Sequence, residues 1–180
     1  MTKYAKIMAT FGVLAGLGVA SLPLATFAAT TSETTVKVTV QEGVSIANDN
    51  STADAGNKTP GEAGTATSNL TAGTNSAAGL KITVKDKDDD TSLHDATITG
   101  TTAGVDFIPT AASGVGTWSL KGGDLTVDTA MVKNSEAALV VKNTSSASTE
   151  HVPVTYRIEP GTAQRQGTYE DVIVYTVTKN

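Results

Sequence analysis

The residues with the clearest potential for ligand chemistry are the aspartates that follow a short apolar segment near the middle of the chain. The run 85–90 reads KDKDDD, and Asp95 follows it. Asp86, Asp88 and Asp90 have the alternate spacing of a calcium-binding loop, in which carboxylate oxygens bind a hard cation. Such a loop also has glycine at its sixth position and a carboxylate at its twelfth, whereas threonine occupies both positions here. The four aspartates therefore predict a partial calcium site, with Ca²⁺ as the one possible cofactor, and a solvated acidic turn is the alternative.

The two histidines, His94 and His151, could act as general bases only beside a positioned nucleophile. The chain has no Gly-X-Ser-X-Gly motif, His94 follows the acidic run, and His151 begins an apolar strand. Both are therefore expected to be exposed surface residues. A sugar-cleaving site would need several aromatic platforms beside its carboxylates, and the glycine-rich segment 100–104 lacks the lysine of a phosphate-binding loop. These patterns predict a protein that is not an enzyme and has no catalytic residues.

Trp118 is the single tryptophan of the chain and lies in the segment GTWSL at 116–120. Large aromatic side chains dominate the cores of small β-domains, so one interpretation places Trp118 between two sheets. The other interpretation makes Trp118 an exposed contact for a glycan or a partner protein.

Alternation of apolar and polar residues, which places one set on each face of a strand, recurs at three places. These are 36–40, 80–84 and, most regularly, 152–158. No segment beyond the first 28 residues shows the 3.6-residue period of a helix. The apolar members of the three strands are Val36, Val38 and Val40; Leu80, Ile82 and Val84; and Val152, Val154, Tyr156 and Ile158.

Further strands are expected toward the C-terminus and in the middle of the chain. In the last of them, 169–178, Ile173, Tyr175 and Val177 share one face. Valines on its other face suggest that this strand is covered on both sides. The remaining candidates are 137–142 and the less regular segments near 96–99, 104–108, 116–120 and 124–127.

Short strands separated by Gly, Asn, Asp and Thr turns indicate an all-β fold. We expect an antiparallel immunoglobulin-like or pilin-like β-sandwich, in which two sheets bury their apolar faces about 10 Å apart. Pro153 has no N–H, so its strand is expected at an edge, or this residue is expected to face away from a neighbouring strand.

Residues 48–79 break the pattern of strands. The segment is rich in Asn, Ser, Thr, Ala and Gly, and Leu70 is its only larger apolar residue. A segment of this composition buries too little apolar surface to fix its own conformation, so it is expected to be a long mobile polar loop.

The first 28 residues have the features of a secretory signal peptide. Lys3 and Lys6 precede the almost wholly apolar segment 7–24, and TFA at 26–28 places small residues at the −3 and −1 positions of a cleavage site. Cleavage after Ala28 would leave 29–180 as a single exported β-sandwich domain. A retained N-terminal anchor is the alternative.

Composition narrows the possible partners. Loss of Lys3 and Lys6 with the signal peptide would change the formal net charge from −5 to −7. An acidic chain is a poor match to nucleic acid, whose phosphates require clustered Lys and Arg, and to anionic membranes. The chain has no cysteine, which excludes a disulfide framework, a thiolate nucleophile and a Cys-ligated zinc site.

The closing segment 166–177, QGTYEDVIVYTV, resembles the GTYxDx(I/V)xYT ending of small exported surface proteins of Saccharibacteria-type bacteria. The segment 78–84, followed by the acidic run, is similar to their middle block, and GTW at 116–118 is similar to their single-tryptophan block. The resemblance covers most of residues 78–178 and implies a surface-exposed β-sandwich.

Two further resemblances concern shorter segments. WSL at 118–120 is similar to the name motif of WxL cell-wall-binding domains, although their second block ends in Trp-Thr-Leu and this chain has YTV at 175–177. The alternating valines of 36–40, ahead of the polar segment 48–79, look like the N-terminal donor strand of pilins and biofilm-fibre subunits.

We therefore expect a non-enzymatic protein, secreted or at the extracellular cell surface, that acts as an adhesin-like or structural envelope module. Its expected partners are a cell-wall polymer, a host surface or other copies of itself, with no nucleic acid and, after cleavage, no membrane. One alternative is a fibre or pilus-like subunit that donates the strand 34–41. Another is a WxL-like wall-binding or carbohydrate-binding domain centred on Trp118.

Overall fold

The computed structural model describes residues 34–96, 106–110 and 116–180. The chain divides into two units, 1–39 and 40–180. The expected signal peptide and most of the expected strand near 96–99 lie outside the described residues. The strands of the second unit are β1 (Val44–Asn48), β2 (Gly64–Thr74), β3 (Leu80–Asp86), β4 (His94–Asp95), β5 (Ile108–Pro109), β6 (Thr117–Gly122), β7 (Leu125–Thr129), β8 (Leu139–Asn143), β9 (Ser148–Glu159), β10 (Tyr169–Glu170) and β11 (Ile173–Lys179).

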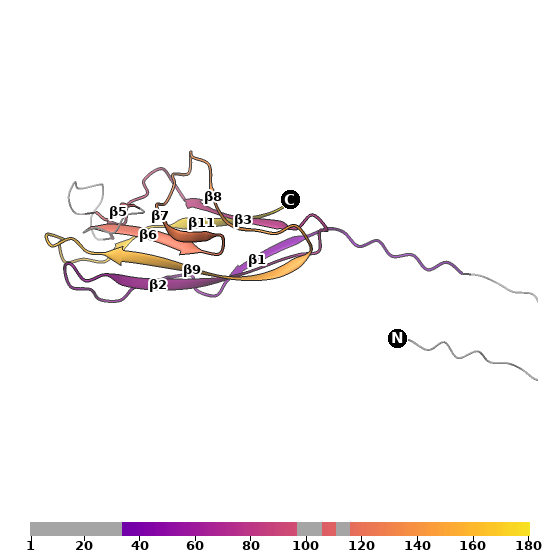
Figure 1. Ribbon diagram of the computed structural model, residues 1–180, viewed down its shortest axis with the longest axis horizontal. Helices are drawn as coiled ribbons and strands as arrows, with labels where there is room; N and C mark the ends of the chain where they lie inside the picture. The colour runs from indigo at the N-terminus through magenta and orange to yellow at the C-terminus, as the bar shows by residue number, and fades with distance from the viewer. Residues whose placement is uncertain (1–33, 97–105, 111–115) are drawn as a thin grey trace, which may run out of the picture. The chain divides into compact units, whose positions relative to one another are not determined.

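The second unit is an all-β sandwich (Figure 1), as the sequence predicts. One sheet has the order β1-β2-β9-β6-β5, with β7 also paired to β6, and the other has the order β11-β3-β8. β4 and β10 form a separate two-stranded sheet. The paired strands are antiparallel except for β5 and β6, which run parallel over two residues. The described part of the chain contains no helix that could span a membrane.

The core lies between the two main sheets. β3 presents Leu80, Ile82 and Val84 to it, and all three are fully buried, so the alternation at 80–84 is confirmed. Val154 of β9 and Leu120 of β6 are fully buried in the same cluster. Burial of one such aliphatic side chain is worth about 1.5–3 kcal/mol, so this interface supplies the main stabilisation of the fold.

β2 overturns the expectation of a mobile loop at 48–79. Its eleven residues pair with β9 without interruption, from Gly64 opposite Ile158 to Thr74 opposite Ser148. Its inward residues alternate as in any half-buried strand. Because they are mostly small, the composition of the segment does not indicate a strand. The inward residues are Ala66, Ser68, Leu70 and Ala72.

The predicted first strand is also wrong. The described residues before β1 have no regular secondary structure, and Val36, Val38 and Val40 are 92%, 84% and 76% exposed. Within the second unit, the Asn75 side chain accepts a bond from the Gly43 N–H at 2.7 Å and donates one to the Gln41 carbonyl at 2.9 Å. A side chain rather than a strand ladder therefore holds the backbone just ahead of β1.

β9 is an interior strand, so Pro153 does not mark an edge. β2 lies on one side of β9 and β6 on the other, and the last pair between β9 and β6 joins Val154 to Gly122. Pro153 lies just beyond that pair, where β6 has ended. This position tolerates a residue without an N–H, in keeping with the second alternative for Pro153.

The predicted strand 169–178 is divided into β10 and β11. Ile173, Tyr175 and Val177 pack against the core, whereas Val172 and Val174 are 55% and 39% exposed. β11 is therefore covered on one face only. The break between the two strands contains Asp171.

Two tyrosine hydroxyls join the sheets across the core. The hydroxyls of Tyr156 on β9 and Tyr175 on β11 lie 2.6 Å apart. Burial raises the pKa of Tyr156, and burial together with the neighbouring Tyr156 raises the pKa of Tyr175, so both hydroxyls stay protonated. Ser68 of β2 also bonds to the Tyr156 hydroxyl, which explains a buried serine in an apolar layer.

Candidate functional site

The acidic turn after β3 is built by its own aspartates. Asp86 Oδ1 accepts the N–H of Asp88 at 2.8 Å, and Asp88 Oδ1 accepts the N–H of Asp90 at 2.8 Å. Asp90 Oδ1 in turn accepts the N–H of Ser92 at 3.4 Å. An aspartate side chain commonly accepts a hydrogen bond from the backbone N–H two residues further along the chain. The alternate spacing therefore has a structural explanation as a series of such turns.

Neighbouring segments hold this turn in place. Asp89 Oδ1 accepts the N–H of Ser135 at 2.8 Å, and this bond lowers the pKa of Asp89. The Lys87 N–H donates to the Val172 carbonyl at 3.0 Å. The turn is thus fixed to the loop after β7 and to the start of β11.

Asp95 belongs to a different part of the structure. It is 4% exposed, on β4, and pairs with Arg165 Nη2 at 3.1 Å. A Cβ on Gly167 would lie 2.6 Å from Asp95 Oδ2, so glycine permits this close approach. Among the described residues, no three histidine, aspartate or glutamate side chains are grouped to hold a metal ion. The four aspartates of the expected calcium site are therefore not brought together as one ligand set.

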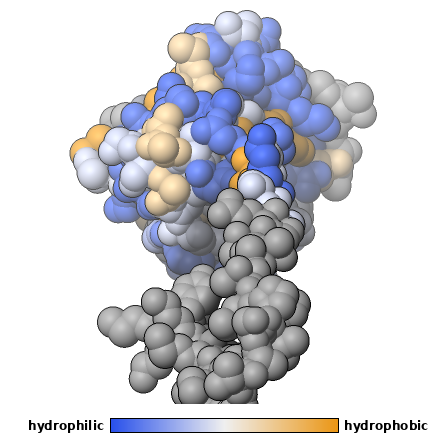
Figure 2. All heavy atoms as spheres, turned by 90° about the vertical axis from the view of Figure 1, so that its right-hand side faces the viewer, coloured by the Kyte–Doolittle hydropathy of each residue, from blue (hydrophilic) through white to orange (hydrophobic). Residues whose placement is uncertain are grey.

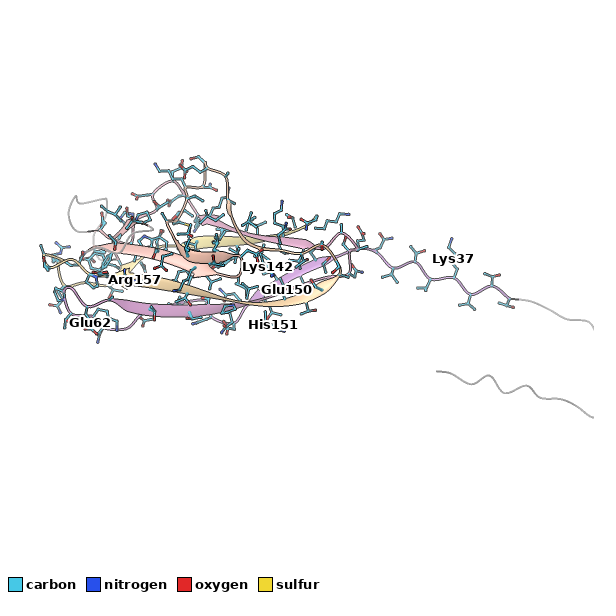
Figure 3. All side chains as sticks on the ribbon, in the orientation of Figure 1. Lys37, Glu62, Lys142, Glu150, His151 and Arg157 are labelled. Carbon is cyan, nitrogen blue, oxygen red and sulfur yellow. The ribbon has the colours of Figure 1, made fainter. Side chains whose placement is uncertain are left out.

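The two histidines have different environments. His94 is half-buried, with Nε2 3.3 Å from Asp90 Oδ2 and Nδ1 3.5 Å from Asp106 Oδ1, so it is not the exposed residue that the sequence suggests. His151 is exposed on β9 (Figure 3). Its Nδ1 lies 3.1 Å from the Thr71 hydroxyl. Neither contact includes a serine in reach of attack on a substrate.

A second, half-buried carboxyl lies beside the acidic turn, at a position that the spacing of the acidic run does not indicate. Asp171, between β10 and β11, lies within hydrogen-bond reach of Asp86. Burial and the adjacent carboxyl of Asp86 raise the pKa of Asp171 to about 8. The pairing of β3 with β11 places Ile173 opposite Asp86, and this register brings the two carboxyls together. Residues 85 positions apart cannot be matched in this way from spacing alone.

Trp118 lies in the core. It is 3% exposed, and its Nε1 donates to the Thr91 carbonyl at 3.0 Å. The interpretation of Trp118 as an exposed contact is therefore wrong, because too little of the ring is accessible to a ligand. The indole instead ties β6 to the end of the acidic turn.

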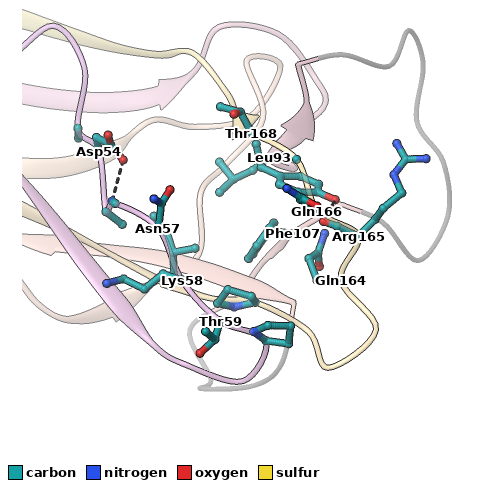
Figure 4. Close-up of a pocket in the computed structure, with 18 residues that line it drawn as sticks. Asp54, Asn57, Lys58, Thr59, Leu93, Phe107, Gln164, Arg165, Gln166 and Thr168 are labelled. Atoms are coloured by element: carbon teal, nitrogen blue, oxygen red, sulfur yellow. Dashed lines mark hydrogen bonds between the residues drawn. The ribbon is translucent and has the colours of Figure 1, made fainter.

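The described surface contains a groove of about 850 Å³, which we call the polar groove. Segment 53–60 forms one wall, and segment 164–169 forms the other. Figure 4 shows Phe107 between these two walls, with Leu93 nearby. The first wall is a loop and belongs to the segment that composition misassigned as mobile, and the second is the loop that leads into β10 at Tyr169.

The walls of the polar groove are polar, and the half-buried Tyr169 supplies the accessible aromatic ring at its floor, above the nearly buried Phe107. The rings of Phe107 and Tyr169 meet edge to face, with centroids 5.1 Å apart. The Tyr169 hydroxyl donates to the Arg165 carbonyl at 2.9 Å, which fixes the second wall. Exposed amide and hydroxyl groups line the walls, and they can both donate and accept hydrogen bonds. They include Asn57, Thr59, Gln166 and Thr168.

Local hydrogen bonds order the first wall. Asp54 Oδ1 accepts the N–H of Gly56 at 2.7 Å, and Glu62 Oε2 accepts the hydroxyl of Thr59 at 2.9 Å (Figure 4 shows the first of these). These contacts, together with the half-buried Ala53 and Ala55, keep the wall in contact with the core. The groove is thus preformed by the fold.

The surface beyond the groove is mixed in character. On the face shown in Figure 2, hydrophilic residues predominate and hydrophobic residues are scattered among them. Individual apolar residues such as Ile108 and Val127 are exposed, at 64% and 69%.

No model of a known protein family matches the chain, and no curated protein matches it either.

Proposed function

We propose that this chain is a non-enzymatic, exported surface protein that acts as an adhesin-like module, binding a hydroxyl-rich polymer in the polar groove. The observation that carries the proposal is a preformed groove of about 850 Å³ with an aromatic floor and amide-bearing walls. The signal-peptide features at 1–28 support export. The ligand classes that fit are cell-wall polymers and glycans of a host surface.

The chemistry of the lining favours sugars over charged or apolar ligands. Asn57 and Gln166, on opposite walls, each offer an N–H donor and a carbonyl acceptor, which a sugar hydroxyl can match. Tyr169 supplies an aromatic surface on the floor for the apolar face of a sugar ring. The described lining contains two cations, Lys58 and Arg165, and one carboxylate, Asp54. Lys58 is paired with Glu62 and Arg165 with Asp95, so net charge does not dominate the groove.

The direct test is retention on purified cell-wall polysaccharide. Replacement of Asn57 and Gln166 by alanine is expected to weaken binding about five- to thirty-fold, because two hydrogen-bonding side chains are lost. A matched variant with Asn50→Ala and Gln41→Ala removes the same side chains from exposed positions outside the groove lining. Equal retention of the two double variants would refute binding in the groove.

A fibre subunit is a second candidate, favoured by one observation. Val36, Val38 and Val40 alternate along a segment without strand partners among the described residues, and each is more than three-quarters exposed. An extended apolar segment of this kind can add as a strand to a sheet edge of another copy. The second candidate is therefore self-assembly by donation of residues 34–41.

Self-assembly predicts a specific change in size. Replacement of Val36, Val38 and Val40 by threonine keeps the shape and β-propensity of the side chains but makes them polar. We expect sedimentation to show assemblies of the wild-type chain and monomers of the triple variant. The control is Lys37→Gln, which replaces a side chain on the opposite face of the same segment. A wild-type chain that sediments as a monomer at high concentration would eliminate this candidate.

A further inference from the structure

We propose that Asp86 and Asp171 together bind a divalent cation of the calcium type, at a site distinct from the polar groove. This site differs from the calcium loop expected from the sequence. It excludes Asp88, Asp90 and Asp95, and it includes Asp171, a carboxyl from near the C-terminal end of the chain. It is independent of the proposed binding of a polymer.

The first observation is an unsatisfied buried oxygen on each side chain. Asp86 is 0% exposed, and its Oδ1 is occupied by the N–H of Asp88. Asp171 Oδ1 accepts the N–H of Val172 at 2.7 Å. The Oδ2 atoms of both residues are buried and receive no hydrogen bond from any described residue. Buried carboxylate oxygens without a donor are costly, so each requires a proton or a cation.

The second observation is that the two carboxyls face each other. They lie within hydrogen-bond reach, yet carboxylate oxygens are acceptors only, so the pair needs a proton or a cation between them. The bond from the Lys87 N–H to the Val172 carbonyl fixes their backbones side by side. A divalent cation would neutralise both carboxylates, whereas one shared proton neutralises only one of them.

The charges around the pair favour a cation. Asp171 lines a hollow of about 400 Å³, which we call the acidic hollow. Its described lining contains four carboxyls, the half-buried His94 and one lysine, Lys87. Of the cations nearby, Arg165 is paired with Asp95, and Lys85 donates to the Asn134 carbonyl at 2.8 Å. The four carboxyls are those of Asp88, Asp95, Glu170 and Asp171.

The ligand chemistry points to calcium. Carboxylate oxygens are preferred by hard cations, and Ca²⁺ accepts irregular coordination completed by water and main-chain carbonyls. Two carboxylates make a weak site, of the kind found in extracellular modules with Kd of about 10⁻⁴–10⁻³ M. The acidic hollow gives solvent and the cation access to Asp171.

The test measures thermal unfolding of the purified chain in chelator and in CaCl₂, with calorimetric titration of Ca²⁺. We expect the wild-type Tm to rise by about 3–6 °C when Ca²⁺ is at about ten times its Kd. Asp171→Asn is expected to abolish this rise and to weaken Ca²⁺ binding at least ten-fold. Asp86→Asn should have the same effect.

The matched control is Glu170→Gln, which removes one negative charge from the same hollow at an exposed position. It should retain most of the rise in Tm. In chelator, Asp171→Asn should have a Tm no lower than that of the wild type, because the substitution removes one of two facing carboxyls. A loss of the Ca²⁺ response in this variant therefore cannot be attributed to misfolding. No Ca²⁺ response in the wild type, or an equal response in Asp171→Asn, would overturn the proposal and leave a shared proton as the bond between the two groups.

Discussion

Leu70→Ala is expected to lower the free energy of unfolding by about 3–5 kcal/mol. Leu70 is fully buried on β2, where it pairs with Val152 of β9, and its side chain packs in the core between the two main sheets. Truncation removes apolar burial and leaves a cavity, since neighbouring strands relax only partly. Urea unfolding followed by circular dichroism measures the change.

The control for this variant is Thr65→Ala, an exposed position on the same strand, where a change within about 0.5 kcal/mol is expected. A mobile loop at 48–79 would make the two variants alike. A loss of less than about 1 kcal/mol for Leu70→Ala would therefore contradict the placement of β2 in the sandwich.

Trp118→Ala is expected to lower the free energy of unfolding by about 3–5 kcal/mol, because it deletes the largest side chain of the core. The variant also loses the bond from the indole Nε1 to the Thr91 carbonyl, which holds the end of the acidic turn. Chemical denaturation monitored by circular dichroism measures the loss without relying on tryptophan fluorescence.

Trp118→Phe separates the two contributions. It keeps an aromatic ring and removes the N–H donor, so we expect a smaller loss of about 1–2 kcal/mol. Wall retention measured well below the midpoint of unfolding should be unchanged in Trp118→Phe. A Trp118→Ala variant that is as stable as the wild type but no longer binds would instead make Trp118 a ligand contact.

Strands with large apolar residues could be predicted from the sequence. The alternations at 80–84 and 152–158 identify β3 and β9, because Leu, Ile, Val and Tyr on one face require burial. The same rule failed at 36–40, where equally regular valines remain exposed. Alternation of apolar and polar residues indicates that a segment can form a strand, but it does not identify the strand with which the segment pairs.

β2 could not be predicted because its inward residues are small. Ala66 and Ala72 bury little surface each, and the strand depends on its long pairing with β9, which is a non-local property. Composition alone assigns such a segment to a loop. Eleven paired residues in a row outweigh the weak local preference.

The candidate sites were only partly visible in the sequence. The acidic run indicated Asp86, but the half-buried Asp171 is brought next to it by the register of β3 with β11. The polar groove joins segment 53–60 to segment 164–169, over one hundred positions away. Such sites are made by strand pairing, so residue spacing could not reveal them.

Binding of a hydroxyl-rich polymer in the polar groove is tested most directly by nuclear magnetic resonance. Backbone amide shifts of the ¹⁵N-labelled chain would be followed during titration with purified wall-polysaccharide fragments. We predict saturable shifts concentrated in segments 53–60 and 164–169, which form the two walls. Saturable shifts confined to the outer face of β2 and β9, around Thr67 and His151, would contradict the account, as would the absence of saturable shifts with wall fragments and host glycans alike.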